Sequence, residues 1–289
     1  MYNALLPHAI GITGLSLAES ISLAKNAGFR GVAFDIVEAR EIAGSQGLDA
    51  LKAMFEDAGI RPAVWGPPVN WMDDAVRDDQ IANLGPYAEV AVALGATNVT
   101  TGIMPANNDR PYDAQYEYLQ TRIRPYAEAL DRYGIRLGIE FISPKTLRDQ
   151  FEYQFVHTMK DMLAFAKDVG TGNVGVLFDV WHHYCAHGTL DDLDVLTPQD
   201  VQLIHTNDAP KGIPIDEQQD LSRTLPMETG VIPAAEMLRK LAEIGVDCAV
   251  GAEPFSARIN ELAAKDPLVA AKETCEAQKK LFAAAGLSA

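Results

Sequence analysis

The sequence predicts an α/β protein in which eight parallel strands and their helices form a single (β/α)8 barrel over residues 1–289. Almost wholly apolar runs recur, as is typical of parallel strands that are buried on both faces. Amphipathic helix patterns separate these runs, and many of the helices end at a glycine. Barrels of this type commonly exceed about 200 residues as one unit, and a hydrophobic content of 48% provides a large core.

The glycines mark a structural repeat. Glycine suits the left-handed residue that ends many helices. The first four spacings predict one helix and one strand about every 36 residues, hence eight units, and the fifth spacing is about twice as long, which leaves room for one unmarked unit. The six glycines are Gly28, Gly59, Gly95, Gly134, Gly170 and Gly245.

The expected strands follow from the same pattern. Ser16 and Glu19 have the spacing of a capping box ahead of the first helix. An open doubly wound sheet is the alternative fold, but residues 11–14 (GITG) are too short for the glycine-rich turn that normally follows its first strand. Strands are predicted near residues 8–12, 31–36, 61–66, 97–103, 136–142, 174–180, 201–206 and 248–254.

The charge balance favours a small-molecule partner. With 24 Lys+Arg against 40 Asp+Glu, the net charge is −16, which opposes non-specific attraction to nucleic acid or to an anionic membrane surface. No uncharged apolar run reaches about 18 residues, so no membrane span is expected. A homo-oligomer or a partner subunit is compatible with this composition.

The cysteines and the N-terminus predict a cytoplasmic protein. Cys185, Cys248 and Cys275 are odd in number and lack CxxC spacing, so they predict neither a disulfide framework nor a cysteine zinc site. The first residues lack a basic segment followed by an apolar core, so a secretory signal is not expected.

Four expected strands carry a polar residue at or near their ends. A carboxylate there is costly to bury unless it is paired, hydrogen-bonded or bound to a metal. Any one of the four could be a helix cap or a salt-bridge partner, but a barrel would bring all four to its C-terminal mouth. Three carboxylates and one imidazole suit Mn²⁺, Mg²⁺, Co²⁺ or Fe²⁺ better than a closed structural zinc site. The residues are Glu140, Asp179, His205 and Glu253.

Such a site predicts a divalent-metal-dependent sugar isomerase or epimerase that acts on a ketose or keto-sugar. A divalent ion bound to the sugar carbonyl and the adjacent hydroxyl acidifies the neighbouring C–H bond and stabilises an enediolate. Glu140 and Glu253 are the expected catalytic base and acid.

Other functions remain open. The same enediolate can expel a β-substituent, which would make the protein a lyase: an inosose dehydratase, or an enzyme that eliminates the aglycone of a 3-keto-glycoside. A non-catalytic sugar-binding subunit is a further alternative. A multi-zinc nuclease is disfavoured by the net charge and by the lack of histidine at the second and third strand ends.

The sequence resembles the xylose isomerase-like TIM barrels, which include ketose 3-epimerases, inosose-processing enzymes and nucleases of the endonuclease-four type. The similar segments are GIEF around Glu140, the Asp-x-x-His pair of Asp179 and His182, HTND beginning at His205, and AEPF around Glu253. The resemblance implies that the four strand-end residues bind one divalent metal ion. It also implies that His182 contacts the substrate.

The same resemblance indicates two basic residues as candidate substrate contacts. Arg223, in RTLPMETG, lies in a segment similar to the arginine–proline–glycine segment of the family and is expected to hold a substrate hydroxyl, although Met227 replaces the usual glycine. Lys211 stands where ketose 3-epimerases often have an arginine, six positions after the histidine.

The residues themselves suggest further substrate contacts. His183 is a rival to His182, because adjacent residues on a turn point apart. Trp65 either belongs to the core or forms a hydrophobic wall beside the substrate. Lys145 and Arg148 follow Glu140 closely and are candidates for orienting a polar substrate.

Residues 206–229 form a segment that is long for a βα connection, which is typical of a functional lid. Its acidic residues Asp216, Glu217 and Asp220 are expected to be solvated. No glycine-rich phosphate cradle follows the last two strands, so the predicted substrate is not phosphorylated.

Overall fold

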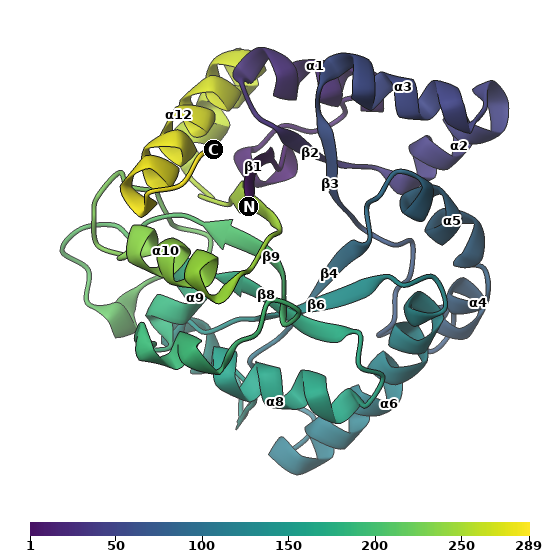
Figure 1. Ribbon diagram of the computed structural model, residues 1–289. Helices are drawn as coiled ribbons and strands as arrows, with labels where there is room; N and C mark the ends of the chain where they lie inside the picture. The colour runs from purple at the N-terminus through teal and green to yellow at the C-terminus, as the bar shows by residue number, and fades with distance from the viewer.

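The computed structural model describes residues Met1–Ala289 and contains a closed barrel of eight parallel strands surrounded by helices (Figure 1). This confirms the predicted (β/α)8 barrel. Around the barrel the strand order is β1-β10-β9-β8-β6-β4-β3-β2, so neighbours in the chain are neighbours in the sheet. The barrel strands are β1 (Tyr2–Leu5), β2 (Gly31–Phe34), β3 (Arg61–Trp65), β4 (Asn98–Ile103), β6 (Arg136–Phe141), β8 (Val174–Asp179), β9 (Val201–Thr206) and β10 (Ala249–Ala252).

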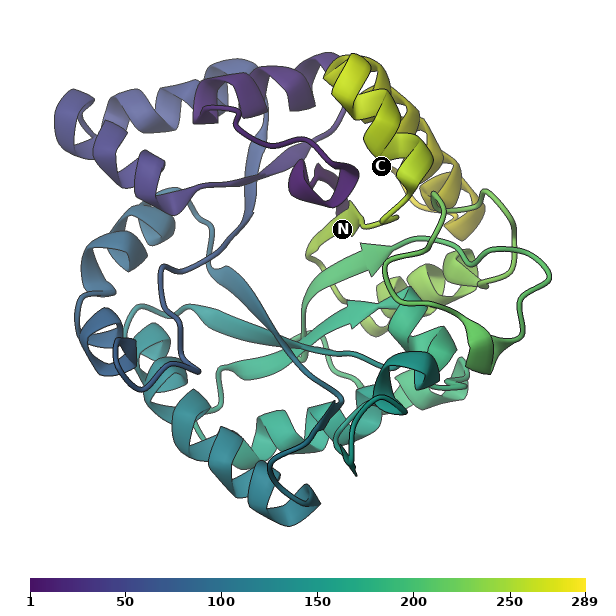
Figure 2. The ribbon, with the colours of Figure 1, turned by 180° about the vertical axis from the view of Figure 1, so that it is seen from behind.

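Helices cover the outside of the barrel, and α12 lies beside α1, which closes the ring (Figures 1 and 2). None of them has the length and apolar character needed to cross a bilayer. The helices are α1 (Leu17–Ala27), α2 (Ile36–Gln46), α3 (Leu48–Ala58), α4 (Arg77–Ala82), α5 (Gly85–Ala93), α6 (Tyr112–Asp131), α7 (Lys145–Arg148), α8 (Met159–Val169), α9 (Val180–Cys185), α10 (Ala234–Ile244), α11 (Ala257–Lys265) and α12 (Pro267–Ala285).

Short elements complete the fold. Strands β5 (Ala106–Asn107) and β7 (Tyr153–Gln154) form a two-stranded antiparallel sheet that joins the segments after β4 and β6. The 3₁₀ helices are η1 (His8–Ile10), η2 (Asp191–Val195) and η3 (Ile215–Glu217).

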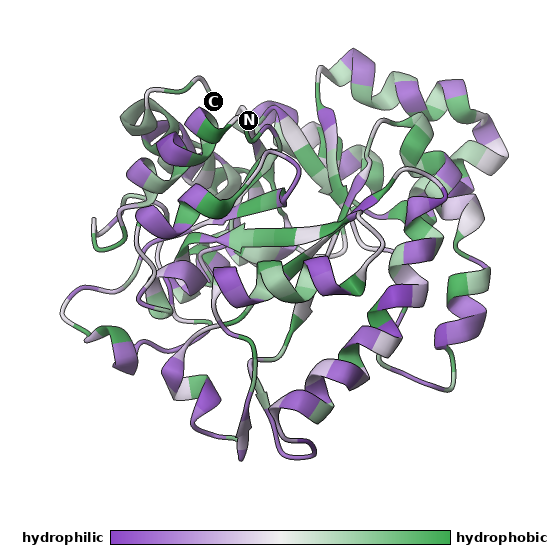
Figure 3. Cartoon of the chain, turned by 60° about the horizontal axis from the view of Figure 1, so that its bottom comes forward, coloured by the Kyte–Doolittle hydropathy of each residue, from purple (hydrophilic) through white to green (hydrophobic).

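The helix signals of the sequence are confirmed. Ser16 and Glu19 form the capping box of α1, and all six repeat glycines have positive φ. In Figure 3 the helices alternate between hydrophilic and hydrophobic residues, as amphipathic helices do, whereas the central strands are mainly hydrophobic.

The prediction of the first strand was wrong. Strand β1 is Tyr2–Leu5, and residues 8–12 contain η1 instead. Pro7 precedes this turn and has no N–H for a strand ladder, while Gly11 ends it with a left-handed φ of 76°. The segment YNAL pairs with both β10 and β2 and so closes the barrel.

Two apolar clusters hold the fold together. One, of 72 buried residues, fills the layer between the barrel and the helices, and the other fills the barrel interior. The interior cluster places apolar side chains directly below the mouth, and its members are Tyr2, Ala4, Leu6, Ala9, Ala63, Val64, Leu177, Leu203 and Ala249.

Candidate metal centre and active site

The period of the strands explains why the four predicted ligands meet. Side chains two positions apart lie on the same face of a strand, and Leu177 and Leu203 fill the barrel interior. Asp179 and His205, two residues further along β8 and β9, therefore face inward at the C-terminal mouth, where they pair in register. Glu140 on β6 and Glu253 just after β10 complete the set on the two flanking strands.

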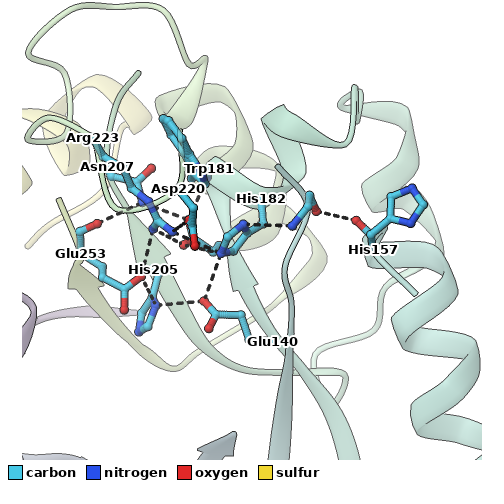
Figure 4. Close-up of polar contacts among 11 residues, drawn as sticks. Glu140, His157, Trp181, His182, His205, Asn207, Asp220, Arg223 and Glu253 are labelled. Carbon is cyan, nitrogen blue, oxygen red and sulfur yellow. Dashed lines mark hydrogen bonds and ion pairs between the residues drawn. The ribbon is translucent and has the colours of Figure 1, made fainter. Parts of the chain in front are cut away.

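Glu140, Asp179, His205 and Glu253 each offer one ligand atom, and these four atoms lie within 4.8 Å of one another. The Nδ1 atom of His205 is 3.4 Å from Oε1 of Glu140 and 3.3 Å from Oε2 of Glu253. Figure 4 shows the imidazole between the two glutamates. The structure thus brings the whole predicted set together, and we call these four residues the cluster.

The cluster fits a divalent cation. Oε1 of Glu140 and Nδ1 of His205 are buried and have no hydrogen-bond partner. Buried polar atoms without partners are rare and destabilise a fold. A cation between the carboxylates would satisfy both atoms, and the oxygen-rich donor set is one that hard divalent ions prefer.

The orientation of Asp179 is fixed by its neighbours. Its side chain is fully buried. Oδ1 accepts hydrogen bonds from the backbone N–H of Trp181 at 2.8 Å and from Nδ2 of Asn207 at 3.1 Å. Asn207 also donates to the carbonyl oxygen of Glu253 at 3.3 Å. Oδ2 of Asp179 is therefore left to face the centre of the cluster.

Arg223 contacts the cluster directly, as its sequence context suggested. Nη1 donates to Oδ2 of Asp179 at 2.8 Å and to Oε2 of Glu253 at 3.0 Å, and Nη2 donates to Oδ1 of Asp220 at 2.9 Å. Because three carboxylates surround one guanidinium, the pKa of Arg223 is raised although burial opposes this. Its side chain is only 1% exposed.

Two aromatic rings hold the guanidinium of Arg223 in place. Its carbon lies 5.1 Å from the ring centroid of Trp181 and 4.9 Å from that of Phe255, which are distances typical of cation–π contacts. The prediction that Asp220 is merely solvated was wrong, since it binds Arg223. The sequence carries no local signal for this pair beyond their separation of three residues.

His182, and not His183, lies at the cluster. Nε2 of His182 is 3.9 Å from Oε1 of Glu140, and its Nδ1 faces the backbone N–H of Ser143 at 3.3 Å (Figure 4). His183 points away and contacts the carbonyl oxygen of Thr189 at 2.9 Å. Burial lowers the pKa of His182 to about 3, so its imidazole is neutral.

The two glutamates of the cluster differ in acidity. Burial, together with the charge of Glu253, raises the pKa of Glu140 to about 7. Burial opposes ionisation of Glu253 as well, but His205 and Arg223 lower the pKa of Glu253 below its usual range. Burial also opposes the charge of His205, yet the two carboxylates raise its pKa well above its usual value. Neighbouring charges thus give two identical side chains different pKa values, as a catalytic acid and a catalytic base require.

Three predicted substrate contacts lie outside the cluster. Trp65 is 2% exposed, belongs to the layer between barrel and helices, and donates its indole N–H to the carbonyl oxygen of Ala96 at 2.8 Å. Trp65 is therefore a core residue and not a wall beside the substrate. Lys145 pairs with Asp149, and Lys211 is exposed and makes no ion pair.

The chain matches the family model described as xylose isomerase-like TIM barrel over residues 21–281. It therefore belongs to this family, which confirms the resemblance seen in the sequence.

Three relatives illustrate the likeness. An inosose isomerase of Halalkalibacterium halodurans is 24% identical over 237 residues, which cover 78% of each chain. A xylose isomerase domain protein from Alicyclobacillus acidocaldarius superposes with a TM-score of 0.85 at 30% identity and covers 99% of both chains. The IOLI protein, solved with a bound zinc atom, shares the fold with a TM-score of 0.75, 20% identity and coverage of 98% of this chain and 99% of that one.

Proposed function

We propose that this protein is a divalent-metal-dependent isomerase or epimerase of a ketose or keto-sugar. The observation that carries the proposal is the convergence of the four ligand atoms within 4.8 Å, with a glutamate on either side of His205. The similarity to an inosose isomerase supports a carbohydrate as the small-molecule substrate.

The cluster residues Glu140, Asp179, His205 and Glu253 would hold the ion. When bound, a divalent ion supplies Lewis-acid polarisation of the sugar carbonyl and stabilises negative charge on its oxygen. Asn207 keeps Asp179 in its ligating orientation, since it binds Oδ1 and leaves Oδ2 turned toward the cluster, where Arg223 also contacts it.

Glu140 and Glu253 move the proton. One carboxylate removes the proton from the carbon beside the carbonyl, which breaks the C–H bond and leaves an enediolate of the sugar. The other carboxyl group returns a proton. Return to the opposite face of the same carbon inverts it. Return to the former carbonyl carbon, with the hydroxyl proton passing from one enediolate oxygen to the other, isomerises the sugar.

His182 and Arg223 orient the sugar. Nδ1 of His182 faces the backbone N–H of Ser143, and its Nε2 lies next to the cluster, 3.8 Å from Oδ2 of Asp179 and 3.3 Å from Nη2 of Arg223. The guanidinium of Arg223 reaches the cluster from the long segment after β9 and lies against Asp179 and Glu253.

The substrate we propose is not phosphorylated. Arg223 is the one cationic side chain of Lys or Arg that contacts the cluster, and three carboxylates already neutralise it. The side chains two positions below Asp179 and His205 are the apolar ones of Leu177 and Leu203. A dianionic phosphate would therefore lack partners, so free sugars should compete for the site and sugar phosphates should not.

We also propose that the reaction takes place in the reducing cytoplasm. All three cysteines are free and buried, and none is paired with another. Free thiols are typical of proteins in reducing compartments.

Deuterium exchange tests the proposed reaction. The purified protein, supplied with a divalent ion, is incubated with ketoses, inososes and 3-keto-glycosides in deuterated water. An isomerised or inverted sugar that carries deuterium beside the carbonyl is the expected product. Loss of water or of an aglycone would identify a lyase instead, and binding of a sugar without any labelling would support a binding subunit.

A further inference from the structure

The segment that carries Arg223 into the cluster has little regular structure. Residues 207–232, here called the strap, link β9 to the N-terminal side of α10 and contain only η3 (Ile215–Glu217). In Figure 2 the strap is the long green loop beside the C-terminal helices. Leu221 and Met227, on either side of Arg223, have φ values of 60° and 65°, which side chains other than glycine rarely adopt. Such strain persists only where surrounding contacts enforce it.

The carboxylate of Asp208 binds the two ends of the strap to each other. It is 1% exposed and accepts five backbone hydrogen bonds. Oδ1 accepts from the N–H groups of Ala209 at 2.9 Å, Val231 at 3.1 Å and Ile232 at 2.9 Å. Oδ2 accepts from Thr229 at 2.9 Å and Gly230 at 2.6 Å. Hydrogen bonds to an ionised acceptor are about twice as strong as neutral ones.

The backbone of Asp208 fixes the residue next to Arg223. Asp208 and Thr224 form an antiparallel bridge, with N–H to carbonyl distances of 3.0 Å and 2.9 Å in the two directions. Asp208 therefore binds both the return end of the strap and the position directly after Arg223.

We propose that Asp208 is a positioning residue for the sugar reaction, which rests on the proposed function: it holds Arg223 against Asp179 and Glu253 without touching the cluster itself. The segment HTND then has three separate tasks. His205 offers a ligand atom, Asn207 orients Asp179, and Asp208 fixes the strap that delivers Arg223.

The variant Asp208→Asn tests the role of the strap separately from the roles of His205 and Asn207. Its amide retains one oxygen, while its NH₂ group faces backbone donors and cannot accept from them. Two or three of the five hydrogen bonds that join the ends of the strap are lost, so that Arg223 is held less firmly, by the backbone bridge of Asp208 to Thr224 alone. The cluster residues keep all of their own contacts.

The test compares Asp208→Asn with Asp200→Asn, with Arg223→Met and with the double variant. Asp200 is a matched control, because it lies at the opposite end of β9, is 9% exposed and also accepts from a backbone N–H, that of Thr197 at 2.8 Å. We expect Asp208→Asn to lower kcat/KM at least tenfold, and to change it less than twofold further in the Arg223→Met background. Asp200→Asn should leave kcat/KM unchanged at a temperature where all variants are folded.

Trp181 supplies a readout that does not depend on turnover. Its ring packs against Arg223, so Asp208→Asn should shift the tryptophan emission in the same direction as Arg223→Met, and Asp200→Asn should not. Thr229→Val removes the hydrogen bond from Thr229 Oγ1 to Ala209 at 2.6 Å and the one that Thr229 Oγ1 accepts from the Val231 N–H at 3.4 Å, but leaves the carboxylate of Asp208 in place. It is a milder variant should Asp208→Asn fail to fold, and it should show a smaller loss that also vanishes in the Arg223→Met background.

Independent, multiplicative losses in the double variant would overturn the proposal, as would an equal loss in Asp200→Asn. If the parent protein turns over no sugar, the proposed function fails, but the emission still decides whether Asp208 and Arg223 are coupled.

Discussion

Nδ1 of His205 lies 3.4 Å from Oε1 of Glu140, and both atoms are buried without a hydrogen-bond partner. The two residues belong to β9 and β6, which β8 separates, so the contact bridges one strand at the barrel mouth. A protein-only cluster leaves these atoms unsatisfied, whereas a shared cation would satisfy both.

Metal binding should therefore stabilise the fold. We expect about one divalent ion per chain, and a gain of about 2.7 kcal/mol in the free energy of unfolding when the free ion is at about 100 times its Kd. Asp179→Asn and His205→Ala should lose most of the ion and most of this gain. Elemental analysis and thermal unfolding with and without chelator measure both quantities. His187→Ala is the control, since His187 is exposed and pairs only with Asp216; unchanged metal content in the cluster variants would eliminate the site.

Glu253→Gln should preserve the fold and remove the chemistry. Glutamine has nearly the same shape but cannot accept or return the proton, so turnover should fall by about 10²–10⁴-fold. Deuterium incorporation should fall with it. Glu273→Gln on α12, a partly exposed glutamate that pairs with Arg258, is the matched control. A Glu253→Gln variant that is as active as the parent would show that Glu253 takes no part in proton transfer.

Gly188→Ala should destabilise the protein without affecting the cluster. A Cβ atom at this position would overlap the imidazole ring of His183, which is buried and held by the carbonyl oxygen of Thr189. Overpacking of this kind costs about 1–3 kcal/mol. Chemical unfolding measures the loss, and metal content should not change. Gly44→Ala in α2 meets no atom within 4 Å and should stabilise slightly, because alanine favours helix; equal losses in both variants would contradict this account of His183.

The polar strand ends in the second half of the chain could be predicted, because a polar residue at the end of a buried strand has few possible environments. In VGVLFDVWHH every residue before Asp179 is apolar or glycine, so the carboxylate has to face the mouth or remain unpaired. The first strand was not predictable in this way. YNAL and HAIGI are both short and largely apolar, and only pairing with β10 and β2 decides between them.

The contacts of the strap lay beyond sequence reasoning for a different reason. Arg223 and Asp179 are 44 residues apart, and no local periodicity relates an irregular segment to a strand end. The resemblance pointed to Arg223, but its partner Asp220 and the anchor Asp208 follow only from the fold. For Trp65 the sequence pattern allowed either a place in the core or a place beside the substrate. The packing of the structure puts it in the core.

Arg223→Met should tighten metal binding while it weakens the metal-free protein. The guanidinium binds Oδ2 of Asp179 and Oε2 of Glu253, so a cation must share these oxygens with Arg223 or displace it, and either effect lowers its affinity. Removal of Arg223 leaves a fully buried carboxylate unpaired, which costs about 3–5 kcal/mol. We expect the melting temperature to fall without metal and to recover with it.

Calorimetric titration should show an affinity at least about tenfold higher, since each 1.4 kcal/mol corresponds to a factor of about ten. Arg122→Met provides the contrast: Arg122 is also buried, pairs with Asp74 and lies over the ring of Tyr118, but it does not contact the cluster. Its loss of stability should be the same with and without metal. A weaker affinity in Arg223→Met would instead show that Arg223 supports the ion, and the competition between the two cations would be disproved.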